Sequence, residues 1–330
     1  MKAVVIGGSG FLGSYVVDAL LSEGHNVLVF DAKESKYLED RKRMRLGDIL
    51  NPKEVLDVVQ DADVVYNFAA IADLDDCIRA PVEAVRYNIL GNTIVLDACA
   101  KAQVKRFLFA STVYVYSTAG GIYRSTKQAC ESLVEDYQKY YGLDFTILRY
   151  GTPYGPRADA RNSVYRILQQ ALEKGRIEYP GDGTELREYI HASDCARLSI
   201  DALDTRYRNE RVVLTGHHGI RVADLFVMVN EILGGNIKIE YSSSSKRSKA
   251  IEPHYRITPY SYSPKIAKKL VNHYYLDLGQ GLLECIEEMR KQSPNEEAFD
   301  QLTARVSLRC EIGARRRLIA EAMKRVLKRF

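Results

Sequence analysis

A tyrosine and a lysine four residues apart, Tyr123 and Lys127, follow a hydroxyl-rich segment that contains Ser111 and Thr112. Side chains at positions i and i+4 of a helix lie on one face, so a phenol and an ammonium at this spacing can act together. The ammonium favours the phenolate, and a nearby hydroxyl can hold a substrate oxygen while the tyrosine exchanges its proton. With 22 tyrosines in the chain, about one such pair is expected by chance, so position must decide.

A glycine-rich turn, GGSGFLG at residues 7–13, stands between a strand-like run and a helix-like run. So tight a turn needs residues without Cβ, and the N–H groups that open the following helix can bind a pyrophosphate. Asp31 ends the next strand-like run, where a carboxylate can accept hydrogen bonds from the adenosine ribose. An acid there repels a 2′-phosphate, which favours NAD over NADP, although Lys33 stands close by. The expected cofactor contacts in this part are Gly7, Gly10, Phe11, Leu12, Gly13 and Asp31.

The elements that must position these residues follow one rhythm. Runs of β-branched residues alternate with helical periods as far as Pro153, which predicts βαβ units and a parallel sheet covered on both faces. The expected fold class is therefore α/β, a doubly wound Rossmann sheet with a smaller mixed C-terminal substrate lobe. The expected boundaries are 1–152 for the NAD-binding domain with a return segment at about 190–218, then 153–189 and 219–295 for the lobe, and 296–330 for a basic amphipathic helical tail.

This rhythm places the Tyr–Lys pair at a functional end of the sheet. The run RFLFAST at 106–112 predicts a strand, with Ser111 and Thr112 near its carboxyl end, where open α/β sheets bind ligands. Residues 123–141 predict a helix that ends at Gly142. Tyr123 and Lys127 therefore lie on the first turns of a helix that follows the ligand-binding edge, which favours the catalytic interpretation over a solvated surface pair.

Composition bounds the class of protein. Of the 330 residues 46% are hydrophobic and 27% charged, which is ordinary for a globular protein, and no run is long and apolar enough for a membrane helix. The N-terminus enters a strand-like run at once, so a cytoplasmic location is expected. No CxxC pair occurs, which indicates reduced thiols and no metal site. The cysteines are Cys77, Cys99, Cys130, Cys195, Cys285 and Cys310.

With these motifs the chain resembles the extended short-chain dehydrogenase/reductases, and among them the nucleotide-sugar epimerase/dehydratase family that includes UDP-glucose 4-epimerase. The resemblance covers about residues 1–290. It rests on the glycine turn, the Y-x-x-x-K pair and five further motifs. These are GDIL at 47–50, NFAA at 67–70, ASTVYVYS at 110–117, LRYGTPYGPR at 148–157 and GDGTELREYIHASDCAR at 181–197.

The resemblance implies roles for individual residues, with NAD as cofactor and a nucleotide-diphosphate sugar as substrate. The implied catalytic residues are Thr112, Tyr123 and Lys127. The implied cofactor contacts, besides the glycine turn and Asp31, are Asp48, Ile49, Phe68, Ala69, Ala70, Asn88, Tyr123, Lys127 and Tyr150. The implied substrate contacts are Ser111, Thr112, Thr152 and Arg187, the last of these as the grip on a phosphate. The role of Arg157 stays open, because this arginine can also simply close the loop by pairing with an acid.

Three departures from the family pattern bear on the reaction. Val113 and Tyr114 follow Thr112, where the dehydratases of the family carry Asp-Glu and the decarboxylases carry a Glu, so the usual base for chemistry at C5 is missing. Thr152 replaces an asparagine that binds the sugar. The segment between Thr112 and Tyr123 is about half the usual length, which predicts a site with an open front.

The leading hypothesis is an NAD-dependent nucleotide-sugar 4-epimerase that acts through a transient 4-keto sugar. A 4-keto reductase or a dehydratase of the same family is the first alternative, and a non-catalytic NAD-binding sensor or scaffold is an alternative of another class. The presence of both Tyr123 and Lys127 speaks against the last. Family members commonly dimerise through two helices, here 88–103 and 123–141, so a homodimer is expected.

The basic tail extends beyond the resemblance. Residues 301–330 hold nine basic and two acidic residues, so the rest of the chain has a net charge of −3 and offers no nucleic-acid surface. From Ile312 to Phe330 apolar residues recur at helical intervals, and basic residues occupy most of the other positions. Two interpretations stay open: a terminal helix packed on the body or on a dimer mate, and a basic helix on an anionic membrane or an acidic partner.

Overall fold

The computed structural model describes residues 1–117, 119–241, 268–271 and 274–292, so the predicted tail at 296–330 lies outside the described residues. Within this part of the chain, eight strands form one parallel sheet in the order β14-β11-β6-β5-β4-β1-β2-β3. The chain order reverses between β1 and β4, which creates a crevice at the carboxyl ends of these strands. The strands are β1 (Lys2–Ile6), β2 (Asn26–Asp31), β3 (Met44–Leu46), β4 (Val64–Asn67), β5 (Arg106–Thr112), β6 (Phe145–Tyr150), β11 (Glu210–Leu214) and β14 (Lys268–Lys269).

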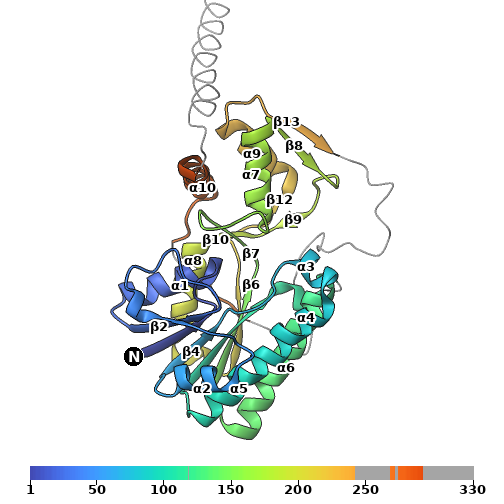
Figure 1. Ribbon diagram of the computed structural model, residues 1–330. Coiled ribbons are helices and arrows are strands. Elements are labelled where there is room, and N and C mark those ends of the chain that lie inside the picture. Colours follow the sequence, from blue (N-terminus) through green and yellow to red (C-terminus); the bar gives the residue numbers. More distant parts are fainter. Residues whose placement is uncertain (118, 242–267, 272–273, 293–330) are drawn as a thin grey trace, which may run out of the picture.

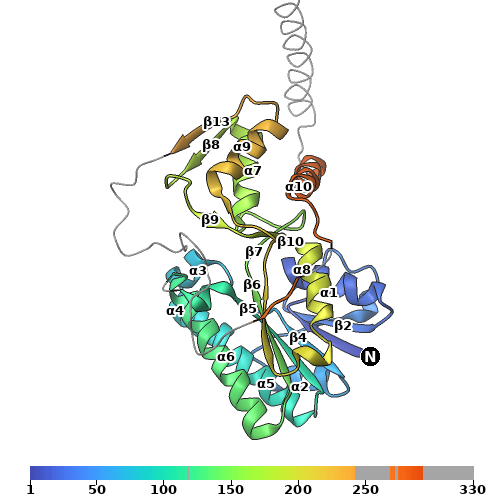
Figure 2. The same cartoon turned by 180° about the vertical axis from the view of Figure 1, so that it is seen from behind.

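Helices cover both faces of this sheet, which confirms the predicted doubly wound α/β fold (Figures 1 and 2). One face carries α1 (Phe11–Ser22) and α8 (Ala192–Asp201), and the other carries α2 (Pro52–Val59), α5 (Asn92–Lys101) and α6 (Gly121–Tyr141). The predicted helix 123–141 corresponds to α6, which begins two residues earlier and ends at Gly142 with φ 73°. Positive φ favours glycine there, so the sequence signal for the helix end was sound.

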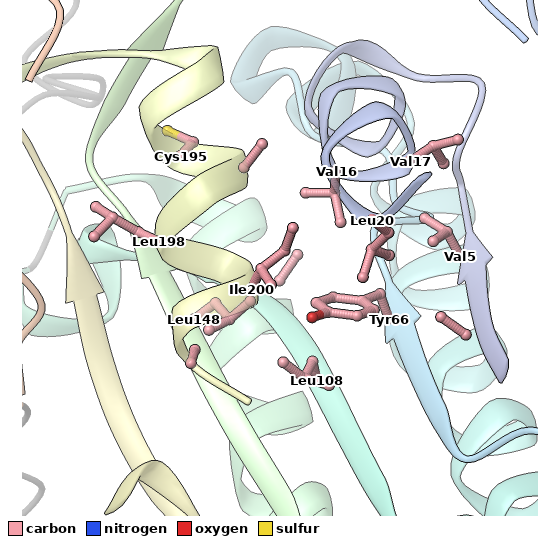
Figure 3. Packing of buried hydrophobic residues seen from close by; sticks show 14 of the residues in the cluster. Val5, Val16, Val17, Leu20, Tyr66, Leu108, Leu148, Cys195, Leu198 and Ile200 are labelled. Carbon is pink, nitrogen blue, oxygen red and sulfur yellow. The ribbon is translucent and has the colours of Figure 1, made fainter. Parts of the chain in front are cut away.

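The core lies between the sheet and these helices. Figure 3 shows Val16 and Leu20 of α1 and Ile200 of α8 gathered between the two helices above the strands, with Leu198 on the other side of α8. Burial of each such side chain contributes about 1.5–3 kcal/mol relative to exposure. Segments far apart in the sequence, residues 11–22 and 192–201, are therefore joined in one core.

A smaller unit lies beyond the carboxyl ends of the strands (Figures 1 and 2). It packs α7 (Ser163–Lys174), α9 (Val222–Ile232) and α10 (Leu278–Gln292) around one apolar cluster. Its strands are β8 (Arg176–Tyr179), β9 (Leu186–Arg187), β12 (Ile220–Arg221) and β13 (Lys238–Tyr241), and β7 (Thr152–Tyr154) pairs with β10 (Tyr189–His191) at the junction with the sheet.

A long interrupted helix runs beside α6. It consists of α3 (Leu74–Arg79), α4 (Pro81–Val85), a π-helical segment η2 (Arg86–Gly91) and α5. The short 3₁₀ helices are η1 (Arg41–Arg43), η3 (Val113–Tyr116) and η4 (Thr205–Tyr207). Among the described helices, none combines the length and the apolar character needed to cross a bilayer.

Candidate active site

The glycine turn folds tightly because two of its glycines leave no room for a side chain. Gly7 has φ 78°, and a Cβ there would lie 2.5 Å from the backbone nitrogen of Ala69. A Cβ on Gly13 would overlap the carbonyl oxygen of Gly7. Gly10, by contrast, would meet only that same carbonyl, at 3.3 Å, so the space above it is open. The turn is therefore closed toward β4 and open toward the crevice.

The helix that follows offers free donors to this open side. Helix α1 begins at Phe11 after Gly10, and no side chain caps its first N–H groups. These groups and the positive end of the helix dipole suit a diphosphate. The residues present thus fit the pyrophosphate of a dinucleotide, with Phe11 and Leu12 on the first turn of α1.

Asp31 ends β2 beside the turn. Its carboxylate accepts hydrogen bonds from the backbone nitrogens of Ser9 at 3.0 Å and Lys33 at 3.1 Å. Ser9 in turn donates its hydroxyl to the Lys33 carbonyl at 2.8 Å. The acid is therefore fixed between the turn and the next loop, and each carboxylate oxygen keeps capacity for a ribose hydroxyl.

The NFAA segment closes the other side of the crevice. Asn67 accepts a hydrogen bond from the Ala69 nitrogen at 3.2 Å and donates to Asn92 at 2.9 Å, which fixes the bend against Gly7. The ring of Phe68 stacks on Tyr66 with 6.3 Å between centroids. Ala70 continues the half-buried bend. Two small side chains here leave the crevice room for a ligand.

The GDIL segment follows β3, the strand beside β2 at one edge of the sheet. Asp48 is exposed. Its Oδ1 accepts a hydrogen bond from the Leu50 nitrogen at 2.9 Å, and its Oδ2 takes no part in that bond. Ile49 is buried in the core against α2 and α5. Asp48 is thus available to a ligand at the rim, whereas Ile49 supports the rim from below.

Tyr123 and Lys127 lie on the first two turns of α6, directly beside β5. The Lys127 ammonium donates to the Ala110 carbonyl at 2.7 Å and lies 4.7 Å from the centre of the Phe109 ring. It lies 5.7 Å from the centre of the Tyr123 ring. Lys127 therefore bridges the helix that carries the phenol and the strand that ends in Thr112.

Burial controls the protonation of this pair. Burial lowers the pKa of Lys127 to about 8 and raises the pKa of Tyr123. The nearby thiols of Cys77 and Cys130 raise the pKa of Tyr123 further. We expected the ammonium to lower the pKa of the phenol. In this structure desolvation dominates, because Lys127 is buried and Tyr123 half-buried, so the charged form of each loses stabilising water.

Asn88 sits in the π-helical segment and ties the loop after β4 to α6. Its side-chain oxygen accepts from the Ile71 nitrogen at 2.7 Å, and its side-chain nitrogen donates to the Ile71 carbonyl and to the Thr126 hydroxyl, each at 3.0 Å. Thr126 precedes Lys127 on α6. Asn88 thus supports the Tyr–Lys helix, and the π turn that aims it is of a kind often found at functional sites.

The remaining predicted residues lie in three places: at the end of β5, beyond the ends of the sheet, and in the core. Thr112 ends β5, and its hydroxyl accepts from the Tyr114 nitrogen at 3.3 Å. Thr152 and Arg187 lie on β7 and β9, beyond the ends of the sheet, and Arg187 is buried and donates to the Leu186 carbonyl at 2.8 Å. Tyr150, in contrast, points into the core under α8, where its hydroxyl bonds to Ser199 at 2.6 Å.

Arg157 has the loop-closing role that the sequence left open. Its guanidinium pairs with Asp18 of α1 and lies between the rings of Tyr15 and Tyr37, 4.5 and 4.4 Å from their centres. The segment after β7 is thereby fastened to the helix that starts at the glycine turn.

A buried polar cluster behind Thr112 was missed by the sequence reasoning. Ser111 donates to Glu131 at 2.6 Å, and Glu131 forms a two-pronged ion pair with Arg149. Glu131 stands four residues after Lys127, so continuation of the helical spacing was the one available signal. The hydroxyl predicted to face the substrate, Ser111, is thus directed into the protein.

A turn that fits a pyrophosphate and a Tyr–Lys pair with a buried lysine lie at the same end of one parallel sheet, an arrangement that suits an enzyme with a dinucleotide cofactor. Comparison with known proteins identifies which. The model of the NAD dependent epimerase/dehydratase family matches residues 3–215, and the chain belongs to this family. It is an enzyme of the nucleotide-sugar epimerase/dehydratase class, and its cofactor is NAD.

Individual relatives carry different activities. The low-salt glycan biosynthesis protein Agl12 of Haloferax volcanii is 32% identical over 61% of this chain and 72% of its own. The UDP-glucuronic acid decarboxylase 1 of Arabidopsis thaliana is 27% identical over 90% of this chain and 72% of its own. A solved UDP-glucuronic acid 4-epimerase from Bacillus cereus, in complex with UDP-glucuronic acid and NAD, has a TM-score of 0.76 and 26% identity over 89% of this chain and 100% of its own.

The packing at Gly7 predicts the outcome of a single added methyl group. Gly7→Ala places a Cβ against the Ala69 backbone at positive φ, so we expect loss of measurable NAD binding by calorimetry. Gly24→Ala is the matched control, because Gly24 also has φ 78° but a Cβ there meets nothing within 4 Å. It should lower stability by about 1 kcal/mol and keep NAD affinity. Equal NAD affinity in both variants would refute this account of the turn.

The lowered pKa of Lys127 predicts a pH-dependent stability. Between pH 8 and 10.5 the unfolded chain binds a proton at this lysine that the folded chain has lost, so stability rises with pH. From pH 7.5 to 9.5 the free energy of unfolding of the cofactor-free protein should rise by about 2 kcal/mol more than that of Lys127→Met. Urea unfolding measures the difference. Lys139→Met, on the exposed face of α6, should retain the rise; parallel curves for the parent and Lys127→Met would contradict the buried lysine.

Proposed function

We propose that the protein is an NAD-dependent nucleotide-sugar 4-epimerase. The observation that carries the proposal is the Tyr123–Lys127 pair held beside the end of β5 with no acidic side chain at the two positions after Thr112, which are Val113 and Tyr114. Reversible oxidation at C4 needs one proton-exchanging group and one hydroxyl to hold the substrate oxygen. A dehydration or decarboxylation usually needs a further acid or base at C5.

The residues of the chain then divide the work. Tyr123 exchanges a proton with the C4 hydroxyl of the sugar, and Thr112 holds that oxygen. When bound, NAD supplies the hydride acceptor and, after the sugar has turned, the hydride donor at C4. Lys127 keeps a positive charge within reach of the phenol, which favours proton release from Tyr123 in the reacting complex. The raised pKa of Tyr123 keeps the phenol protonated in the free enzyme. This agrees with the proposed cycle, because the phenol must carry its proton again when each cycle ends.

The buried Arg187 supports a diphosphate substrate. Arg187 lies on β9 in the small unit, where its guanidinium is buried and donates to the Leu186 carbonyl at 2.8 Å. A planar guanidinium suits two phosphate oxygens at once. We therefore assign Arg187 to the nucleotide-diphosphate end of the substrate, and Thr152, at the junction of the two units, to the sugar end.

The proposal is tested with a panel of UDP-, GDP- and dTDP-sugars and with Tyr123→Phe. We expect the parent enzyme to give a product of unchanged mass with a new set of anomeric NMR signals, and Tyr123→Phe to bind NAD normally but to lose about 100- to 10,000-fold in turnover. Tyr165→Phe, on α7 outside the proposed site, is the control and should keep its activity. Loss of water or of carbon dioxide from the substrate would replace the epimerase proposal by a dehydratase or a decarboxylase, and net consumption of NADH by a reductase.

We also propose that the protein is a homodimer. Two neighbouring elements beside α6 expose large apolar side chains: Val82 and Val85 on α4 are 74% and 47% exposed, and Leu90 on η2 is 51% exposed. The C-terminal end of α6 adds Tyr140 and Tyr141, 66% and 67% exposed. Figure 1 shows these helices side by side along one flank of the sheet domain. Exposed apolar side chains gathered on adjoining helices favour a self-complementary interface.

Leu90→Glu tests the interface. A buried charge without a partner is costly, so light scattering should give about twice the 37.3 kDa chain mass for the parent and the single chain mass for the variant. Val227→Glu is the control, because Val227 is 50% exposed on α9, in the small unit, and should leave the mass unchanged. A monomeric parent, or a dimeric Leu90→Glu, would refute the proposed interface.

A further inference from the structure

The cluster behind Thr112 adds buried side-chain bonds to the backbone ladder between β5 and β6 and to the Lys127–Ala110 bond between α6 and β5. Glu131 of α6 accepts the Ser111 hydroxyl at 2.6 Å and two bonds from Arg149 of β6, at 2.9 and 2.6 Å. Arg149 also donates to the Tyr116 hydroxyl at 2.6 Å and lies 4.6 Å from the centre of that ring. One carboxylate and one guanidinium thus connect β5, β6, α6 and η3.

These elements are the ones that carry the proposed chemistry. Ser111 is the residue before Thr112 on β5, and Glu131 lies one turn after Lys127 on α6. Tyr116 closes η3, the 3₁₀ turn that Thr112 caps with its hydroxyl. Displacement of any connected element therefore changes the distance between the Thr112 hydroxyl and the phenol of Tyr123.

The cost of the cluster indicates a role other than general stability. Glu131 and Arg149 are 2% and 1% exposed, and removal of two charges from water offsets much of their attraction. Well-packed apolar residues of similar volume often stabilise a core equally well. Directional bonds, however, fix positions in a way that apolar contacts do not. The carboxylate accepts three hydrogen bonds from protein donors, so the cluster is built to hold a geometry.

We propose that Glu131 and Arg149 are positioning residues, which act through Ser111 and Tyr116 to hold the Thr112 hydroxyl at its working distance from Tyr123 and Lys127. Neither residue is assigned a contact with the substrate or the cofactor. The inference rests on the proposed function, since it presupposes that Thr112 and Tyr123 act on the same sugar oxygen. A shift of about 1 Å between such groups can cost about 100-fold in rate.

The experiment uses two mild variants of the full-length enzyme, because substitution of Glu131 or Arg149 leaves a buried charge unpaired and endangers folding. Ser111→Ala removes one bond to Glu131, and Tyr116→Phe removes one bond to Arg149. Ser111→Thr restores the hydroxyl. Ser22→Ala is the control, because the Ser22 hydroxyl makes a local bond to Ala19 on the exposed side of α1.

Kinetic constants are measured with the nucleotide sugar that the parent enzyme converts. We expect Ser111→Ala and Tyr116→Phe to lose about 10- to 100-fold in kcat with KM within about 3-fold of the parent, and Ser111→Thr to recover most of the loss. Ser22→Ala should match the parent. A purely structural role predicts a lower melting temperature with an unchanged kcat per folded, NAD-loaded enzyme, and that result would overturn the proposal.

A second measurement does not depend on turnover. The Tyr114 amide donates to the Thr112 hydroxyl, so its hydrogen exchange reports how firmly that hydroxyl is placed. Exchange in residues 113–116 should accelerate at least about 10-fold in Ser111→Ala and Tyr116→Phe and stay unchanged in Ser22→Ala. Parent-like exchange in both variants would refute the positioning role even if no substrate in the panel is converted. Inactivity of Tyr123→Phe together with full activity of Ser111→Ala would leave the epimerase proposal intact and remove this one.

Discussion

The close approach of two backbones at Gly7 is the constraint on which the site depends. The turn after β1 lies so near the backbone of Ala69, after β4, that a Cβ between them would be 2.5 Å from a nitrogen. Asn67 holds the second backbone in place, and Asp31 holds the tip of the turn through Ser9. Three neighbouring strands thereby end in one crevice, and the first turn of α1 opens onto it with unbonded N–H groups. Without this contact there is no common edge at which a dinucleotide and a substrate can meet.

Of the two groups proposed to react, Lys127 is buried and Tyr123 is half-buried. Lys127 is 3% exposed, donates a hydrogen bond to the Ala110 carbonyl and contacts the Phe109 ring. Desolvation lowers its pKa to about 8 and raises that of Tyr123. Such a pair is costly in folding free energy but responds strongly to any charge brought into the site, because few water molecules screen it. The proposed function would explain why the protein keeps such a pair, since proton exchange needs a group whose protonation responds to a bound charge.

Two sets of polar contacts keep this pair in register. Asn88, aimed by a π turn, ties α6 to the loop after β4, and Glu131 with Arg149 ties the same helix to β5 and β6. Arg157 joins the small unit to α1 by pairing with Asp18. The elements that face the crevice are thus fixed by directional bonds, whereas the rest of the sheet domain is held by the apolar packing of α1, α8 and the strands.

The sequence by itself determined the fold class, the glycine turn, the Asp31 carboxylate and the Tyr–Lys helix, because each depends on local spacing: periodicity, residues without Cβ, and i, i+4 neighbours. It could not show that Ser111 turns toward Glu131, that the Tyr150 hydroxyl meets Ser199, or that burial outweighs charge attraction at Tyr123. Those outcomes join residues that are 20 to 49 positions apart or depend on how much water surrounds a group. Only tertiary packing determines which distant residues meet and how much water surrounds a group. It decides which side of a strand is buried and which polar atoms find a partner there.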